Sequence, residues 1–156
     1  MSVYYIIDGY NLIHCNAEIF SDNIQRARDY LTELIRIKRP HGSPRNNITV
    51  VYDGQPGVSS PSAKEIDVRF TSGKEADWMI EKIVKEHLNP KEIIVVTDDK
   101  RLRKRIRNYK ANWMATEDFI SRMKKKLKPP KKSESSLSKK EKKVITDEFL
   151  KIWRDK

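Results

Sequence analysis

The sequence has a single cysteine, Cys15, and no long apolar run. One cysteine excludes an intrachain disulfide and indicates a reducing compartment. We expect Cys15 to be a packed, unreactive thiol, because no base is evident beside it. No stretch reaches the roughly 18 apolar residues that a membrane-spanning helix needs, and Asp8 interrupts the only apolar segment near the N-terminus. These absences predict a cytoplasmic protein with no membrane partner.

Motifs for nucleotide and zinc binding are also missing. Neither GxGxxG nor GxxxxGK[ST] occurs, which argues against a loop that cradles nucleotide phosphates. His14, His41 and His87 show no metal-ligand spacing, so zinc is not expected.

Positive charge is abundant and unevenly distributed. The chain has 33 Lys and Arg against 22 Asp and Glu, a net charge of +11. Residues 1–123 have a net charge of only +3, whereas residues 124–156 have +8. A nearly balanced body with a basic tail indicates a polyanionic partner such as RNA or DNA. The alternative is that surface lysines only keep the protein soluble.

The length of 156 residues favours one domain, which we place over residues 1–127. Residues 128–140 are rich in lysine, serine and proline and are expected to form a basic linker. Residues 141–156 have an apolar stripe typical of a C-terminal amphipathic helix. That helix could dock on the body or on a partner.

Apolar periodicity predicts an alternation of strands and helices in the first domain. Strands are expected over residues 3–7, 48–52, 66–70, 93–96 and 112–115, with the third near an edge and the very apolar fourth central. Helices are expected from Ser21 or Asp22 to residue 38, over 74–88, from Asp98 or Asp99 to 108, and over 117–126. This alternation indicates an α/β fold with a mostly parallel sheet covered on both faces.

Acidic side chains recur where these strands end or where the next helix begins. They are Asp8, Asp53, Glu75, Asp77, Asp98 and Asp99. Since the carboxyl ends of parallel strands share one edge of a sheet, these acids should lie close together. Crowded carboxylates resist ionising together unless a cation lies among them. The pattern therefore predicts a Mg²⁺ or Mn²⁺ site, although each acid alone could be a turn residue or a helix cap.

Polar and basic residues accompany the acids. Asn11 could bond a carboxylate, a metal-bound water or a phosphate. A basic segment follows the Asp98–Asp99 pair and suits a phosphodiester backbone, although part of it could be an ordinary solvated helix face. It comprises Lys100, Arg101, Arg103, Lys104, Arg105, Arg107 and Lys110. Four aromatic residues could stack nucleobases, but we expect core packing for the last: Tyr10, Trp78, Tyr109 and Trp113.

The string Ile6-Ile7-Asp8-Gly9-Tyr10-Asn11-Leu12-Ile13 resembles the opening of YacP-like NYN-domain proteins, a branch of the PIN-like ribonucleases. Residues 50–54, 70–71, 75–77, 80–81, 96–99 and 115–119 extend the resemblance, and the tail helix is similar as well. The resemblance covers nearly the whole chain. It implies a three-layer α/β/α domain with strand order 3-2-1-4-5 and metal-dependent RNA cleavage.

The resemblance also implies roles for the acids. By position, Asp8, Asp77 and Asp98 match the core acids of the family, and Asn11 matches its polar residue. Asp53, Glu75 and Asp99 match as auxiliary ligands. Many relatives have a non-acidic residue after the late Ser-Asp pair, so the motif leaves open whether Asp98 or Asp99 points at the metal.

We therefore expect a Mg²⁺- or Mn²⁺-dependent endoribonuclease with Asp8, Asn11, Asp77 and Asp98 as catalytic residues. Its substrate would be RNA, either free or within a ribonucleoprotein such as the ribosome. A non-catalytic RNA-binding adaptor with the same fold is the main alternative. A DNA or flap nuclease and a receiver domain phosphorylated at Asp53 are further ones. The sequence does not define the oligomeric state.

Overall fold

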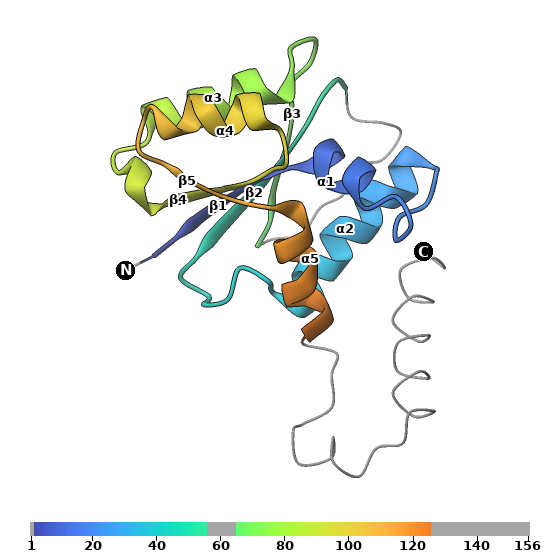
Figure 1. Cartoon of the computed structure of the whole chain (residues 1–156). Coiled ribbons are helices and arrows are strands. Elements are labelled where there is room, and N and C mark those ends of the chain that lie inside the picture. The colour runs from blue at the N-terminus through green and yellow to red at the C-terminus, as the bar shows by residue number, and fades with distance from the viewer. Residues whose placement is uncertain (1, 56–64, 126–156) are drawn as a thin grey trace, which may run out of the picture.

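The computed structural model describes residues 2–55 and 65–125, which form one sheet between two layers of helices (Figure 1). The strands are β1 (Tyr4–Asp8), β2 (Asn47–Tyr52), β3 (Asp67–Phe70), β4 (Ile93–Val96) and β5 (Asn112–Met114). The helices are α1 (Gly9–Cys15), α2 (Ile24–Lys38), α3 (Ala76–Glu86), α4 (Lys100–Arg107) and α5 (Thr116–Lys125). A 3-10 helix, η1 (Pro90–Glu92), leads into β4.

The sheet has the order β3-β2-β1-β4-β5, and all four strand pairs are parallel. This confirms the expected α/β fold, the strand order and the edge position of β3. The middle strand is β1, whereas β4 lies between β1 and β5. Because every strand runs in the same direction, the residues that follow the strands gather at one edge, where ligands of open α/β sheets bind.

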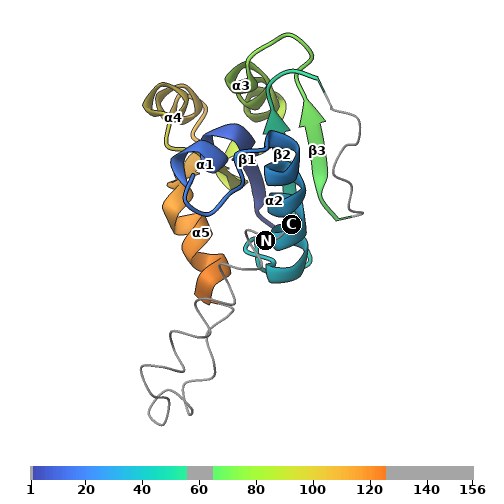
Figure 2. The same cartoon turned by 90° about the vertical axis from the view of Figure 1, so that its right-hand side faces the viewer.

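Each face of the sheet is covered by its own group of helices (Figure 2). Helices α3 and α4 cover one face, where Ile6 packs in a core that includes Ile80 and Leu102. Helices α1, α2 and α5 cover the other, where Ile7 packs with Leu31 and residues of the neighbouring strands. Ile6 and Ile7 point to opposite faces because side chains alternate along a strand. Burial of both faces explains the nearly continuous apolar runs in β1, β2 and β4.

Helix α1 is absent from the sequence prediction, because a glycine directly after a strand commonly marks a sharp turn. Gly9 is instead the first residue of α1. A Cβ atom at Gly9 would lie 2.3 Å from the ring of Tyr52, which is fully buried. Glycine is therefore required at this position by close packing against an aromatic ring rather than by the conformation of a turn.

Three further local expectations were wrong. Helix α2 is capped by Asn23, whose side chain accepts a hydrogen bond from the N–H of Arg26 at 3.0 Å, rather than by Ser21 or Asp22. Cys15 is exposed rather than packed. Trp113 is 42% exposed rather than part of the core, because it lies on the edge strand β5.

The predicted linker over 128–140 and the predicted helix over 141–156 lie outside the described residues. Within residues 2–55 and 65–125, no helix is both long enough and apolar enough to cross a bilayer.

Candidate functional site

Asp8, the last residue of β1, lies at the centre of the acidic edge of the sheet. Its side chain is almost fully buried, and the hydroxyl of Thr97 donates a hydrogen bond to its Oδ2 at 3.0 Å. Burial raises the pKa of Asp8 from 3.8 to about 7; the hydrogen bond from Thr97 opposes this rise, and the charges of Asp53, Asp99 and Asp77 add to it. The ionised form of Asp8 is therefore costly unless a cation lies nearby.

Asp77 lies in the first turn of α3, and its two carboxylate oxygens have different surroundings. Its Oδ2 accepts from Nη1 of Arg105 at 3.2 Å, which joins α3 to α4. Its Oδ1 is buried and has no hydrogen-bond partner within the described part of the chain. A buried carboxylate oxygen without a partner is unfavourable, and a cation beside it would remove that cost.

Asp53 and Glu75 both lie at the N-terminus of α3. Asp53 is exposed, and its Oδ1 accepts a hydrogen bond from the N–H of Ala76, the first residue of α3. Asp53 therefore stabilises the N-terminus of this helix while its charge acts on Asp8. Glu75 occupies the N-cap position and is exposed, and its side chain makes no capping hydrogen bond. Within residues 2–55 and 65–125, no hydrogen bond or ion pair links the Glu75 side chain to the other acids.

Asp98 is bound to the start of α5. Its Oδ1 accepts from the N–H of Thr116 at 2.9 Å and from Nη2 of Arg103 at 3.3 Å, and its Oδ2 accepts from the Thr116 hydroxyl at 2.5 Å. Partial burial works to raise the pKa of Asp98, but hydrogen bonds from Thr116 and Cys15 and the charge of Arg103 bring it below its ordinary value.

The charge of Asp99 is one of those that raise the pKa of Asp8. It is the N-cap of α4, and its Oδ1 accepts from the N–H of Arg101 at 2.9 Å. Its own N–H donates to the hydroxyl of Thr97 at 3.1 Å. The two acids thus have different partners: the charge of Asp99 acts on Asp8, whereas the carboxylate of Asp98 is hydrogen-bonded to Thr116 at the start of α5.

Asn11 connects α1 to the turn that carries these two acids. Its Oδ1 accepts from the N–H of Asp98 at 2.8 Å and from the hydroxyl of Thr97 at 3.4 Å. Thr97 is fully buried and contacts Asp8, Asn11 and Asp99. Sequence reasoning did not identify Thr97, because its partners meet only when β1 and β4 pair.

The thiol of Cys15 lies beside Asp98, but its surroundings do not activate it as a nucleophile. Partial burial, its hydrogen bond to Asp98, and the negative charges of Asp98 and Asp8 raise its pKa. A raised pKa keeps the thiol protonated at neutral pH, so Cys15 is exposed and yet a weak nucleophile.

The acids form a loose oxygen-donor set rather than a closed cage. Nowhere in the described residues do three His, Cys, Asp or Glu side chains converge closely enough to be grouped as a metal site. Mg²⁺ is commonly held by only one or two carboxylates and keeps several waters. The free Oδ1 of Asp77, the buried Asp8 and the nearby Asp99 therefore fit a hard cation such as Mg²⁺ or Mn²⁺ in their donor chemistry.

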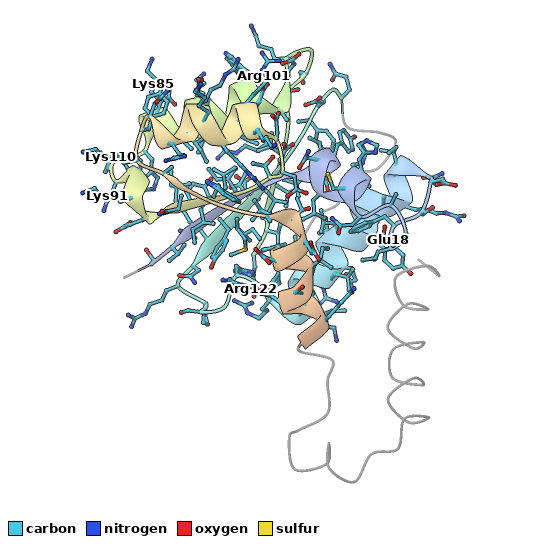
Figure 3. All side chains as sticks on the ribbon, in the orientation of Figure 1. Glu18, Lys85, Lys91, Arg101, Lys110 and Arg122 are labelled. Carbon is cyan, nitrogen blue, oxygen red and sulfur yellow. The ribbon has the colours of Figure 1, made fainter. Side chains whose placement is uncertain are left out.

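The basic residues of α4 divide into two groups. Arg103 and Arg105 are partly buried and bonded within the protein: Arg103 to the carbonyl of Thr97 at 3.0 Å, and Arg105 to Asp77. The other predicted nucleic-acid-binding residues are exposed: Lys100, Arg101, Lys104 and Arg107. Figure 3 shows Arg101 extending outward, with Lys85, Lys91 and Lys110 around the same α3–α4 layer.

The family model of the YacP-like NYN domain matches residues 5–155 of this chain. The chain therefore belongs to the YacP-like NYN domain family, a branch of the PIN-like nucleases, and not to the receiver domains. The fold resembles the crystal structure of Rae1 (YacP) from Bacillus subtilis, with a TM-score of 0.65 and 19% identity over 95% of this chain and 84% of that one. A mutant form of the same protein gives a TM-score of 0.63 and 20% identity over 96% and 91%. No curated protein matches the chain.

Proposed function

We propose that this protein is a metal-dependent endoribonuclease of the cytoplasm, which cleaves RNA at the acidic edge of its sheet. The observation that carries the proposal is Asp8, buried at the end of β1 within reach of three other carboxylate charges. Such an arrangement is unfavourable in the protein alone and becomes favourable around a cation. Membership of a PIN-like nuclease family supports the same chemistry.

In this proposal Asp8, Asp77 and Asp99 hold Mg²⁺ or Mn²⁺. When bound, the ion would lower the pKa of a water and neutralise charge on the phosphate. Asp53 and Glu75 are at the rim, where they would bind a second ion or orient water. Asp98 is a positioning residue, because its carboxylate is already engaged by Thr116 and Arg103.

The protein's own residues orient these ligands. The Thr97 hydroxyl donates to Asp8, and Arg105 donates to Oδ2 of Asp77, which leaves Oδ1 of Asp77 for the ion. Asn11 accepts from the Asp98 N–H and thereby fixes the turn from which Asp99 projects. We propose that Asn11 acts through this turn, in addition to any contact with substrate. Hydrolysis would leave a 5′-phosphate and a 3′-hydroxyl.

The exposed cations of α4 supply affinity for the substrate, which would be RNA free or within a ribonucleoprotein. Lys100, Arg101, Lys104 and Arg107 are available to phosphates because they are exposed. Binding through such contacts depends little on sequence and weakens steeply as salt rises. Nothing in these contacts reads a 2′-hydroxyl, so the same surface would also attract single-stranded DNA.

The test is cleavage of end-labelled single-stranded RNA and matched DNA in Mg²⁺, Mn²⁺ or EDTA. Wild-type protein is compared with Asp8→Asn and with Asp67→Asn, a matched control at the opposite end of the sheet where β3 begins. We expect metal-dependent RNA cleavage by the wild type and the control, and at least 100-fold less by Asp8→Asn. Equal RNA binding by all three proteins without cleavage would instead support the non-catalytic adaptor.

A further inference from the structure

Trp78 is a large aromatic side chain on the surface of α3, next to the acidic site in sequence. It is 42% exposed, although tryptophan is highly buried in most proteins. The ammonium groups of Lys74 and Lys82 lie 5.0 Å and 5.2 Å from the centroid of its ring. Both lysines are exposed. An exposed indole between two flexible cations is typical of surfaces that bind single-stranded nucleic acids, where bases stack on aromatic rings and cations bind the backbone.

Trp113 has the same exposure of 42% but a different environment. The guanidinium of Arg103 lies only 3.6 Å from its ring centroid. That guanidinium is itself held by the carbonyl of Thr97 at 3.0 Å and by Asp98 at 3.3 Å. One face of Trp113 is therefore covered by an anchored group, so a base could stack there only if Arg103 broke its internal bonds.

The cations at Trp78 can be displaced at low cost. An exposed lysine over an aromatic ring changes an equilibrium constant by only about 2- to 5-fold. Stacking of one base on an aromatic residue contributes roughly 5- to 150-fold. A base can thus replace a lysine on the ring, and the released ammonium can bind a neighbouring phosphate. The two tryptophans differ in this respect, because within the described part of the chain no hydrogen bond anchors the ammonium group of Lys74 or Lys82, whereas Arg103 is anchored.

The position of Trp78 relates it to the acids. It directly follows Asp77 in α3, and neighbouring residues on a helix project about 100° apart. Asp77 points towards Arg105 and acts on Asp8, whereas Trp78 lies on the adjacent exposed surface. The indole therefore lies one helical position from an acid of the site, within reach of a nucleotide strand that has a phosphate there.

We infer that Trp78 stacks a nucleobase of single-stranded RNA beside the acidic site, and that Lys74 and Lys82 bind the flanking phosphates. The inference takes its substrate from the function proposed above. It assigns Trp78, rather than Trp113, as the stacking residue.

The test uses the full chain carrying Asp8→Asn, in EDTA, so that binding is measured without cleavage. In this background Trp113→Phe and Trp153→Phe leave Trp78 as the only tryptophan; Trp153 lies outside the described residues. Titration with oligouridylate should quench the fluorescence of Trp78 as the base stacks. A parallel titration with oligodeoxythymidylate shows whether the stacking requires RNA. Binding without any change in Trp78 fluorescence would overturn the inference.

Affinity provides a second readout with a matched control. In the Asp8→Asn background, Trp78→Leu should weaken oligouridylate binding about 5- to 150-fold. Trp78→Phe keeps an aromatic ring and should retain most of the affinity. Trp113→Leu should change the affinity less than about 3-fold. Equal losses for both leucine variants, or none for Trp78→Leu, would contradict the assignment. Circular dichroism melting of each variant identifies any loss caused by unfolding. Because these measurements exclude metal and cleavage, a failure of the nuclease proposal would leave their outcome unaffected.

Discussion

Thr116 holds the carboxylate of Asp98 with two hydrogen bonds, one from its N–H at 2.9 Å and one from its hydroxyl at 2.5 Å. The next residue, Asp99, is instead grouped by charge with Asp8. Two adjacent acids with the same sequence context therefore have different surroundings. Asp98 joins the end of β4 to the start of α5, whereas Asp99 caps α4.

The first prediction separates the roles of these two acids. Asp99→Asn should reduce cleavage at least 100-fold with little change in stability, because asparagine caps a helix about as well as aspartate. Asp98→Asn should lower the free energy of unfolding by about 1–3 kcal/mol, since it loses a charged acceptor for several donors. Urea unfolding and single-turnover cleavage measure the two effects. The reverse pattern, with Asp98→Asn inactive but fully stable, would assign the metal to Asp98.

The second prediction concerns metal binding. Mn²⁺ at 100 times its dissociation constant should raise the free energy of unfolding by about 2.7 kcal/mol if it binds only the folded state. Asp8→Asn and Asp77→Asn should lose most of this stabilisation, and Asp67→Asn should keep it. Differential scanning fluorimetry across a Mn²⁺ titration, with EDTA as the reference, measures the shift. Equal shifts in all four proteins would mean that the ion binds elsewhere.

Much of the sheet could be predicted from the sequence because β1, β2 and β4 are short apolar runs that end in an acid or are followed closely by one. Asp8 ends β1, Asp53 follows β2 and Asp98 follows β4, and the helices expected between these strands favour a parallel arrangement. The same pattern placed the candidate acids at one edge. These features depend on local sequence, so they are visible without the fold.

Contacts between distant residues could not be predicted in the same way. The division of roles between Asp98 and Asp99 depends on Thr116, which reaches Asp98 only when β5 and α5 are in place. Helix α1 was missed because Gly9 is normally a turn signal, whereas here it makes room for Tyr52. Trp113 has an aromatic side chain suited to a core, but its strand lies at the edge of the sheet.

The third prediction tests the packing of Gly9 on Tyr52. A Cβ at residue 9 would lie 2.3 Å and 2.5 Å from two ring atoms of Tyr52, and this ring is fully buried. Gly9→Ala should therefore lower the free energy of unfolding by about 1–3 kcal/mol through overpacking. It should also reduce cleavage, because Asp8 is the preceding residue. Chemical unfolding monitored by circular dichroism measures the loss.

A double-mutant cycle distinguishes overpacking from an effect on the helix itself. Alanine is a better helix former than glycine, so its local contribution to α1 is favourable. In a Tyr52→Leu background the ring is gone, and Gly9→Ala should then cost much less than in the wild type. An equal cost in both backgrounds would show that Tyr52 is not the cause.

The fourth prediction follows from the pKa of Asp8, which rises from 3.8 to about 7 in the folded protein. The folded state then holds this proton more tightly than the unfolded state does. The stability contributed by protonated Asp8 is fully present below about pH 4 and is lost as pH rises through about 7. The shift corresponds to a loss on the order of 4 kcal/mol, since one pKa unit is about 1.4 kcal/mol.

Asp8→Asn removes this dependence, because the amide stays neutral at every pH and can still accept from Thr97. In EDTA, the free energy of unfolding of Asp8→Asn minus that of the wild type should therefore increase from pH 4 to pH 7 and then level off. Any change in packing adds a constant to this difference and does not alter its slope. Urea unfolding of both proteins at intervals from pH 4 to pH 8 measures the slope, with Asp67→Asn as the exposed-acid control. A difference that is flat with pH would show that Asp8 ionises at its ordinary pKa, which would remove the electrostatic reason for a cation at this site.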